Sequence, residues 1–381
     1  MKSKSGIWIQ SLPSVSIAVL KIWRFMTMYG VGKTLFKVFG RMRPKNFTTG
    51  FRRSRDIGLI GCGQFAYATI GYSIWRKYGN RFVVCYDINN VNQASLAAFF
   101  GISADARSAS DVINDERVIV VYIASNHASH TDYAIEALLA GKTVYVEKPI
   151  SVSITQLSRL RDVGLRPGGR IYAGYNRPFS GAVRQLRKEV GVSNKPLTLG
   201  CFVSGHLIEP DHWYRRPEEG TRICGNVGHW LDLAVHILSW GELPDCWHIM
   251  VSYSDDNSRD DNVAITLTSE RGDLVNIVLT ARSEPFEGIN ETINFQQGDV
   301  ISKIDDFRRM KVWKGPKVRK FRYWPKDVGH NLAIIQPFSD VKRDWNEVEL
   351  STLLMLFITD MVVNAKRFSE FSFSNELARI T

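Results

Sequence analysis

Short apolar runs alternate with longer segments of mixed polarity between residues 56 and 178. Runs of this kind, bounded by Gly, Asp or Asn, are typical of strands buried on both faces of a sheet, and the segments between them predict helices. Such strand–helix alternation predicts a parallel, doubly wound sheet. The predicted strands are 56–60, 81–86, 118–124, 143–146 and 171–175.

After residue 179 the pattern changes to longer strands, a Lys314-Gly315-Pro316 turn and few helices. This predicts an α+β domain on a mostly antiparallel, open sheet. The expected class is therefore α/β, with domains at 56–178 and 179–381 behind an extension at 1–55. The predicted strands are 197–203, 246–253, 263–268, 274–280, 289–295, 310–313 and 318–324, and the predicted helices are 179–190, 226–240 and 348–367.

The charge lies mostly in the extension. Residues 1–55 hold twelve Lys and Arg and no acid, whereas the other residues hold 37 basic and 38 acidic side chains. The balanced body does not predict a nucleic-acid partner. Residues 17–42 contain apolar side chains interspersed with basic ones. This pattern is typical of helices on an anionic membrane surface and also of helices packed on the protein's own body. Both alternatives stay open, with membrane contact expected through residues 1–50.

The composition argues against a membrane-spanning, a disulfide-rich or a metal-binding protein. The chain has no long uncharged apolar run that would span a bilayer. Its five cysteines show no C-x-x-C spacing, so we expect no disulfide framework and no metal. A reducing compartment follows, hence a cytoplasmic location, with the inner face of the membrane as an alternative.

A glycine-rich turn carries the first chemical signal. Gly61-x-Gly63-x-x-Ala66 follows a predicted strand and opens a helix, and Asp87 ends the next strand. Gly61 allows a tight turn, Gly63 lets the backbone approach a pyrophosphate, and Ala66 allows close packing of helix on strand. A carboxylate at Asp87 accepts hydrogen bonds from ribose hydroxyls and repels a 2′-phosphate, which favours NAD over NADP. The turn residues Gln64 and Phe65 are expected at the same cofactor.

Polar residues follow two later strands. Ser125, Asn126 and His130 come after the strand 118–124, where open sheets bind ligands, and are expected on the nicotinamide side, although such histidines also cap helices. Glu147 and Lys148 close the following strand. A lysine is costly at the mouth of an apolar sheet, so its presence suggests a partner such as a substrate oxygen.

The predicted helix 226–240 carries a possible acid–base pair. Asp232 and His236 lie four residues apart on one face, so the carboxylate can orient the imidazole as a general base. His229 and His236 are two turns apart, about 10 Å, which argues against one metal ion between them. The alternative is a buried Asp–His pair that only packs the helix.

These segments together resemble the Gfo/Idh/MocA oxidoreductases, the relatives of glucose–fructose oxidoreductase and inositol dehydrogenase. The matching segments are Gly-Leu-Ile-Gly-Cys-Gly-Gln-Phe-Ala, Ala-Ser-Asn-His-Ala-Ser-His, Leu-Leu-Ala-Gly-Lys-Thr-Val, Glu-Lys-Pro and Asp-x-x-x-His. The resemblance implies a Rossmann domain that binds NAD(P) and a second domain that binds substrate and often forms the oligomer. It implies that Lys148, Asp232 and His236 are catalytic, and that Asn126 and Glu147 contact the cofactor.

The sequence departs from the family in two places: Ile-Cys-Gly-Asn-Val-Gly-His precedes the Asp-x-x-x-His helix, and Asn176-Arg177-Pro178 follows the strand at 171–175. The tract from His206 to Arg222 is dense in donors and aromatic faces, as recognition of a carbohydrate or nucleotide phosphate requires. The residues expected at the substrate are Arg177, His206, Arg215, Arg216, Asn226 and His229.

The resulting hypothesis is an NAD-dependent dehydrogenase, a dimer or tetramer, that acts on a sugar or nucleotide sugar in polysaccharide biosynthesis. Two alternatives remain. One is a glycosidase that uses NAD for transient oxidation and elimination. The other is a non-catalytic cofactor-binding scaffold at a membrane.

Overall fold

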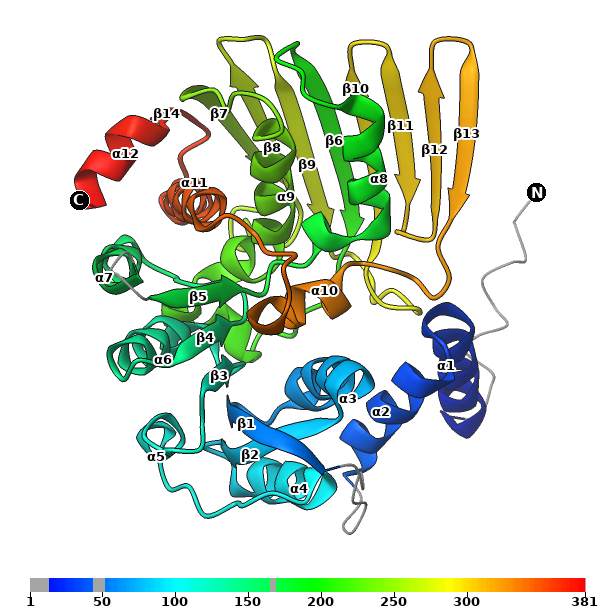
Figure 1. Cartoon of the computed structure of the whole chain (residues 1–381). Helices are drawn as coiled ribbons and strands as arrows, with labels where there is room; N and C mark the ends of the chain where they lie inside the picture. Colours follow the sequence, from blue (N-terminus) through cyan, green and yellow to red (C-terminus); the bar gives the residue numbers. More distant parts are fainter. Residues whose placement is uncertain (1–13, 44–51, 165–168, 381) are drawn as a thin grey trace.

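The computed structural model describes residues 14–43, 52–164 and 169–380 and contains two sheets (Figure 1). The first is parallel and has the strand order β2-β1-β3-β4-β5, which confirms the predicted doubly wound sheet. Its strands are β1 (Arg52–Ile60), β2 (Asn80–Tyr86), β3 (Val120–Ile123), β4 (Thr143–Val146) and β5 (Arg170–Ala173).

Both faces of this sheet are buried. Along β3, Val121 and Ile123 join one apolar cluster while Val120 and Tyr122 join another, because successive side chains of a strand point to opposite faces. Helices supply the other side of each cluster, as a parallel sheet requires. They are a π-helical turn at Ala66–Gly71, α3 (Tyr72–Tyr78), α4 (Asn90–Phe100), α5 (Ala109–Ile113), α6 (His127–Leu139) and α7 (Ile154–Gly164).

The second sheet has the order β13-β12-β11-β10-β6-β9-β8-β7-β14 and is antiparallel except between β6 and β9. The sequence predicted all its strands except β11 and β14. Alternate residues are buried, so one face packs on helices and the other is open. The strands are β6 (Leu197–Ser204), β7 (Cys246–Tyr253), β8 (Val263–Ser269), β9 (Leu274–Thr280), β10 (Asn290–Gln297), β11 (Val300–Asp305), β12 (Arg309–Lys314), β13 (Lys317–Arg322) and β14 (Phe368–Ser372).

Helices α8 and α9 cover one face of this sheet, and α11 packs beside α9 (Figure 1). The open face exposes large apolar side chains, among them Phe202, Met250 and Ile301. An oligomer formed through this face stays a prediction. The helices are α8 (Gly181–Val190), α9 (Gly228–Leu238), α10 (His330–Ile334), α11 (Trp345–Val363) and α12 (Phe373–Ile380).

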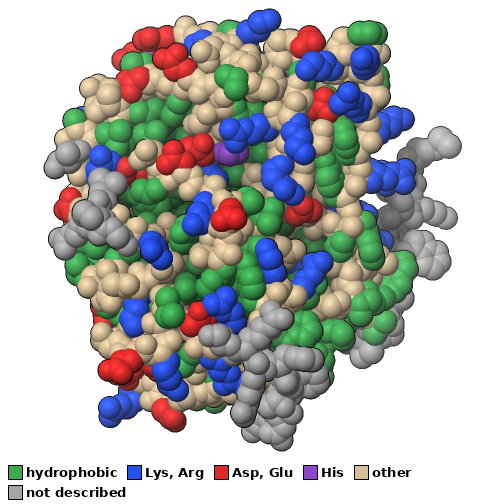
Figure 2. All heavy atoms as spheres, in the orientation of Figure 1, with side chains coloured by type: hydrophobic (Ala, Val, Ile, Leu, Met, Phe, Trp, Pro, Cys, Tyr) green, Lys and Arg blue, Asp and Glu red, His purple; other side chains and the backbone are tan. Residues whose placement is uncertain are grey.

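The edge strand β13 carries a row of exposed basic residues, and Figure 2 shows Lys and Arg side chains gathered over this end of the sheet. Charged side chains on an edge strand oppose pairing with another chain. The row comprises Lys317, Arg319, Lys320 and Arg322.

The chain returns to the first sheet after strand β13 of the second sheet. Ile334 and Ile335, in and after α10, are buried in the cluster that covers one face of the parallel sheet. The Tyr122 hydroxyl donates to the Ile334 carbonyl at 2.6 Å, and the Gln336 amide donates to the Ala173 carbonyl at 3.0 Å. The sequence limits of 56–178 and 179–381 therefore separate two sheets but not two independent cores.

The extension folds as the predicted pair of helices, α1 (Ser14–Tyr29) and α2 (Val31–Met42), and packs on the body of the protein. Phe36 is buried in the Rossmann core. The Lys326 amide donates to the Met28 carbonyl at 2.7 Å, and the Gln64 side chain donates to the Lys37 carbonyl at 3.1 Å. The inner face of the pair is thus bound by both domains.

The outer face of α1 remains uncovered among the residues that the structure describes. Val19, Ile22 and Trp23 are exposed there, at 60%, 43% and 55%. No helix in the described ranges is long and apolar enough to cross a membrane. Peripheral contact with a membrane surface stays a prediction.

We expect Ile334→Ala to destabilise the whole protein. The side chain is fully buried, so its loss leaves a cavity that costs about 2–5 kcal/mol. Chemical denaturation would measure this, with Val318→Ala on exposed β13 as the control. An equal, small effect of both substitutions would contradict the shared core.

Candidate active site

The glycine-rich turn has the shape that a dinucleotide requires. Gly61 has φ +91°, and a Cβ there would lie 2.4 Å from the Ala124 carbonyl oxygen, so only glycine fits. A Cβ at Gly63 would meet no atom within 4 Å. The open space at Gly63, just before the helical turns that begin near Gln64, fits a pyrophosphate.

Asp87 lies beside this turn. Its carboxylate accepts hydrogen bonds from the Cys62 amide at 2.6 Å and from the Asn89 amide at 2.8 Å, which fixes it at the end of β2. Arg43, in the extension, donates to the Cys62 carbonyl at 3.1 Å and to the Ser95 hydroxyl at 2.7 Å. No motif in the sequence predicted that the extension would reach the cofactor turn.

Some polar groups of the residues after β3 already form hydrogen bonds with the second domain. The Asn126 amide donates to buried Glu219 at 2.8 Å, and the same carboxylate accepts the Ala128 amide at the start of α6 at 3.2 Å. Ser125 is half-buried and contacts Ser129. His130 is buried and lies 2.8 Å from the Pro149 carbonyl, so it holds the turn after β4. Burial lowers the pKa of His130 to about 4.

Glu147 is buried at the end of β4. The Tyr145 hydroxyl donates to it at 2.7 Å, and burial raises its pKa to about 7 against the opposing effects of Tyr145 and Lys148. A Cβ at Gly174 would lie 2.8 Å from this carboxylate, so the glycine makes room for it. Glu147 can therefore change charge near neutral pH.

Lys148 is one of the residues that link the two domains. Its Nζ donates to the Gly225 carbonyl, just before α9, at 2.7 Å. The ammonium also lowers the pKa of four histidines, after the larger effect of burial on each. The four are His127, His130, His229 and His330.

A cavity of about 480 Å³ lies next to two of these histidines. His229 and His330 line it, and within the described residues the buried Nδ1 of each lacks a hydrogen-bond partner. Gln64 and Phe65 of the glycine-rich turn line the same cavity. It therefore connects the predicted cofactor side with the histidines, and its size suits a small polar ligand.

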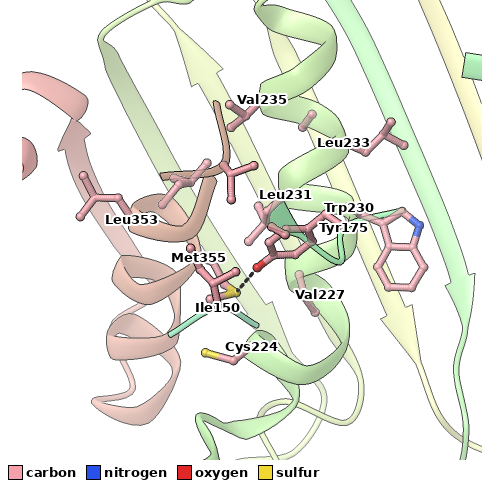
Figure 3. Packing of buried hydrophobic residues seen from close by; sticks show 14 of the residues in the cluster. Ile150, Tyr175, Cys224, Val227, Trp230, Leu231, Leu233, Val235, Leu353 and Met355 are labelled. Atoms are coloured by element: carbon pink, nitrogen blue, oxygen red, sulfur yellow. Dashed lines mark hydrogen bonds between the residues drawn. The ribbon is translucent and has the colours of Figure 1, made fainter. Parts of the chain in front are cut away.

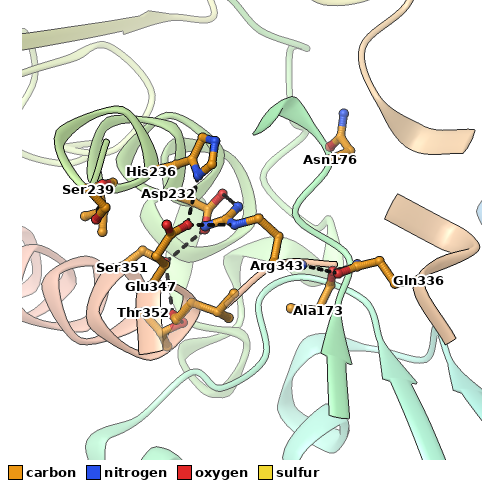
Figure 4. A network of polar contacts seen from close by, with 12 residues as sticks. Ala173, Asn176, Asp232, His236, Ser239, Gln336, Arg343, Glu347, Ser351 and Thr352 are labelled. Atoms are coloured by element: carbon orange, nitrogen blue, oxygen red, sulfur yellow. Dashed lines mark hydrogen bonds and ion pairs between the residues drawn. The ribbon is translucent and has the colours of Figure 1, made fainter. Parts of the chain in front are cut away.

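The structure does not bring Asp232 and His236 to Lys148. Asp232 is fully buried and binds Arg343 with both oxygens, at 2.9 and 3.2 Å (Figure 4). His236 Nδ1 lies 2.8 Å from Glu347, and its Nε2 accepts a hydrogen bond from Trp240 at 3.3 Å. Both side chains are thus engaged in a buried network toward α11.

Periodicity explains this difference. The four-residue spacing shows that Asp232 and His236 share a face of α9, but not which element that face meets. Apolar contacts determine which element this side of α9 meets. Leu231 and Val235 of α9 belong to the same buried cluster as Leu353 and Met355 of α11 (Figure 3). His229, at the start of α9, instead lines the cavity.

Only some of the residues expected at the substrate line the cavity. Arg177 and His206 line the cavity; Arg177 is buried, pairs with Glu291 at 2.7 Å and lies 4.3 Å from the Trp230 ring. Asn226 accepts a hydrogen bond from Arg222 at 3.3 Å, whereas Arg215 pairs with Asp261 and Arg216 is exposed on the loop.

Sequence reasoning missed several residues around the cavity, because no motif marks them. Buried Arg222 donates to Asp261, to Asn226 and to the His206 carbonyl, and so fixes the loop before α9. In the described ranges no cluster of His, Cys, Asp and Glu is arranged to hold a metal ion. The missed residues that line the cavity include Lys33, Lys37, Glu291, Lys326 and His330.

Comparison with known proteins confirms the resemblance over the first domain. Residues 55–175 match the Gfo/Idh/MocA model, described as an oxidoreductase family with an NAD-binding Rossmann fold. The inositol 2-dehydrogenase of Klebsiella pneumoniae (strain 342) is 30% identical over 152 residues, 39% of this chain and 45% of that protein. That of Ralstonia nicotianae is 28% identical over 192 residues, 49% of this chain and 53% of the relative. The chain thus matches about half the length of these curated relatives.

Solved structures share the fold over most of the chain. A levoglucosan dehydrogenase in complex with NADH has a TM-score of 0.68 at 16% identity and covers 84% of this chain and 99% of its own. An NAD binding oxidoreductase from Klebsiella pneumoniae has a TM-score of 0.67 at 16% identity, with the same coverage. At this identity the likeness shows the two-domain fold.

We expect Asp232→Ala to destabilise the protein strongly, since it leaves the buried Arg343 without its main counter-charge. The cost of such a loss is about 3–5 kcal/mol, measured by denaturant unfolding. Asp256→Ala, at an exposed ion pair with Arg367, is the matched control. If both variants were equally stable, the network would not have the structural role assigned here.

Proposed function

We propose that this chain, whose residues 55–175 match the Gfo/Idh/MocA oxidoreductase family, is an NAD-dependent dehydrogenase of a hydroxyl or keto group in a sugar or polyol. The observation that carries the proposal is that His229 lines the cavity that reaches the glycine-rich turn, while Lys148 is hydrogen-bonded to Gly225, four residues before His229. The named likenesses to inositol and levoglucosan dehydrogenases support the same class of substrate.

The turn around Gly61 and Gly63 would hold the pyrophosphate, and Asp87 the adenosine ribose. Glu147 and Ser125 border the expected nicotinamide position at the carboxyl ends of β4 and β3. NAD, when bound, would accept hydride from the substrate carbon or return it.

Lys148 and His229 have complementary tasks in this proposal. One Lys148 N–H is bound to Gly225, and the others remain to donate to the reacting oxygen, where they stabilise its negative charge. Burial and nearby cations hold the pKa of His229 well below its usual value, so its ring is neutral. A ring nitrogen of this neutral imidazole at the cavity wall can then accept the hydroxyl proton during oxidation. We therefore assign the general base to His229 rather than to His236.

A nucleotide sugar of polysaccharide biosynthesis is the finer proposal. The basic side chains at the cavity support a substrate that carries a phosphate or carboxylate, as does the aromatic and basic loop that Arg222 fixes. A glycosidase that oxidises and then re-reduces its substrate would form no net NADH. NADH accumulation on incubation with NAD⁺ and a sugar separates the two activities.

We expect Lys148→Ala and His229→Ala each to lower kcat/KM by about 10²–10⁴-fold, the usual contribution of a charge-stabilising donor or a general base. NADH absorbance against a panel of sugars and nucleotide sugars measures this. His236→Gln is the control because its ring faces α11, and the folded variant should keep most of its activity. Equal losses for His229 and His236 would contradict the assignment.

We expect the protein to bind NAD⁺ more tightly than NADP⁺, because the Asp87 carboxylate repels a 2′-phosphate. Asp87→Asn keeps an oxygen for the Cys62 amide but removes the charge, and should lower the NAD⁺/NADP⁺ affinity ratio at least about tenfold, or 1.4 kcal/mol. Calorimetry measures both affinities. Asp105→Asn, an exposed carboxylate of the same domain, should leave the ratio unchanged.

A further inference from the structure

The N-terminal extension forms one wall of the candidate active-site cavity. Phe25 and Tyr29 of α1 and Lys33 and Lys37 of α2 line it, opposite residues of both domains. Lys33 Nζ lies 4.8 Å from the centre of the Tyr29 ring, and Lys37 Nζ lies 3.7 Å from that of Phe25. The two lysines are four residues apart on one helix, so their side chains are neighbours.

Other cations at this cavity are neutralised by carboxylates. Arg177 pairs with Glu291 at 2.7 Å, and Lys326 pairs with Asp306. By contrast, no described carboxylate forms an ion pair with Lys33 or Lys37. Glu287, which lines the same cavity, is itself bound to Arg24 at 2.7 Å.

Two unpaired ammonium groups here raise the free energy of the protein without a ligand. Burial, with a smaller contribution from neighbouring cations, lowers the pKa of Lys33 and of Lys37 to about 8, and Asp327 partly opposes this for Lys33. An anion between them would remove this cost and gain charge-assisted hydrogen bonds. The apolar and aromatic surroundings would strengthen the attraction by excluding water.

We propose that Lys33 and Lys37 bind the phosphate or carboxylate group of an anionic sugar substrate whose reacting carbon lies near His229. This inference rests on the proposed dehydrogenase function and names its substrate class. The extension is then a specificity element of the active site, with a role beyond anchoring α1 and α2 to the body.

A second cavity, of about 260 Å³, adjoins the first at Lys37 and could hold a further part of the substrate. Lys37 lines both cavities, and Lys21 and Arg41 line the smaller one. A substrate longer than a monosaccharide could extend along this path from His229 past Lys37. A diphosphate, as in a nucleotide sugar, has the length and charge for it.

The test uses the full chain with NAD⁺ present and inorganic phosphate as the first probe. Calorimetry should show one phosphate bound, and Lys33→Gln/Lys37→Gln should weaken its binding at least about tenfold. Lys317→Gln/Lys320→Gln, which removes the same charge from exposed β13, is the matched control and should bind phosphate as the unmodified protein does. Absence of phosphate binding to the unmodified protein, or equal binding to both variants, would overturn the proposal.

Competition with sugars then identifies the anion. Glucose 6-phosphate and glucuronate should displace phosphate, and neutral glucose should not; displacement by one of the two alone would assign the subsite to phosphate esters or to carboxylates. Phosphate that neither sugar anion displaces would overturn the substrate subsite. These measurements need no turnover, so a chain that binds sugar anions but forms no NADH with any sugar would disprove the dehydrogenase function separately.

Discussion

The candidate site depends on one half-buried ammonium, that of Lys148, at the carboxyl end of a parallel sheet. Its hydrogen bond to the Gly225 carbonyl joins the Rossmann sheet to the entry of α9 in the second domain. Burial lowers the pKa of His127 and His229, and the Lys148 ammonium lowers it further, so these rings are held neutral. Neutral imidazoles beside a fixed cation are what proton transfer and charge stabilisation require of one site.

The sequence predicted the parallel sheet and the glycine-rich turn because both follow from local rules. The position of Gly61 depends on a strand, a turn and a helix that are consecutive in the chain, and each leaves its own pattern. The same holds for Lys148, since the end of an apolar strand is visible in the sequence. Features set by consecutive residues could therefore be predicted without the structure.

Features that depend on distant segments could not. Asp232 and His236 have the spacing of an acid–base pair, yet Arg343 and Glu347, more than a hundred residues later, bind them in the interior. The strand β11 mixes polar and apolar residues and is stabilised by pairing with both β10 and β12. The extension showed an amphipathic pattern, but periodicity cannot say whether a body or a membrane covers an apolar stripe.

The return of α10 to the first sheet affects the order in which the chain can fold. Ile334 and Ile335 complete an apolar cluster whose other members mostly precede residue 146. During synthesis, the nucleotide-binding half therefore leaves the ribosome with part of its interior missing, and that gap closes only when Ile334, 161 residues after the end of β5 at Ala173, has been made. Fragments that stop after β5 should consequently behave as incomplete folding units, even though their motif for the dinucleotide is intact.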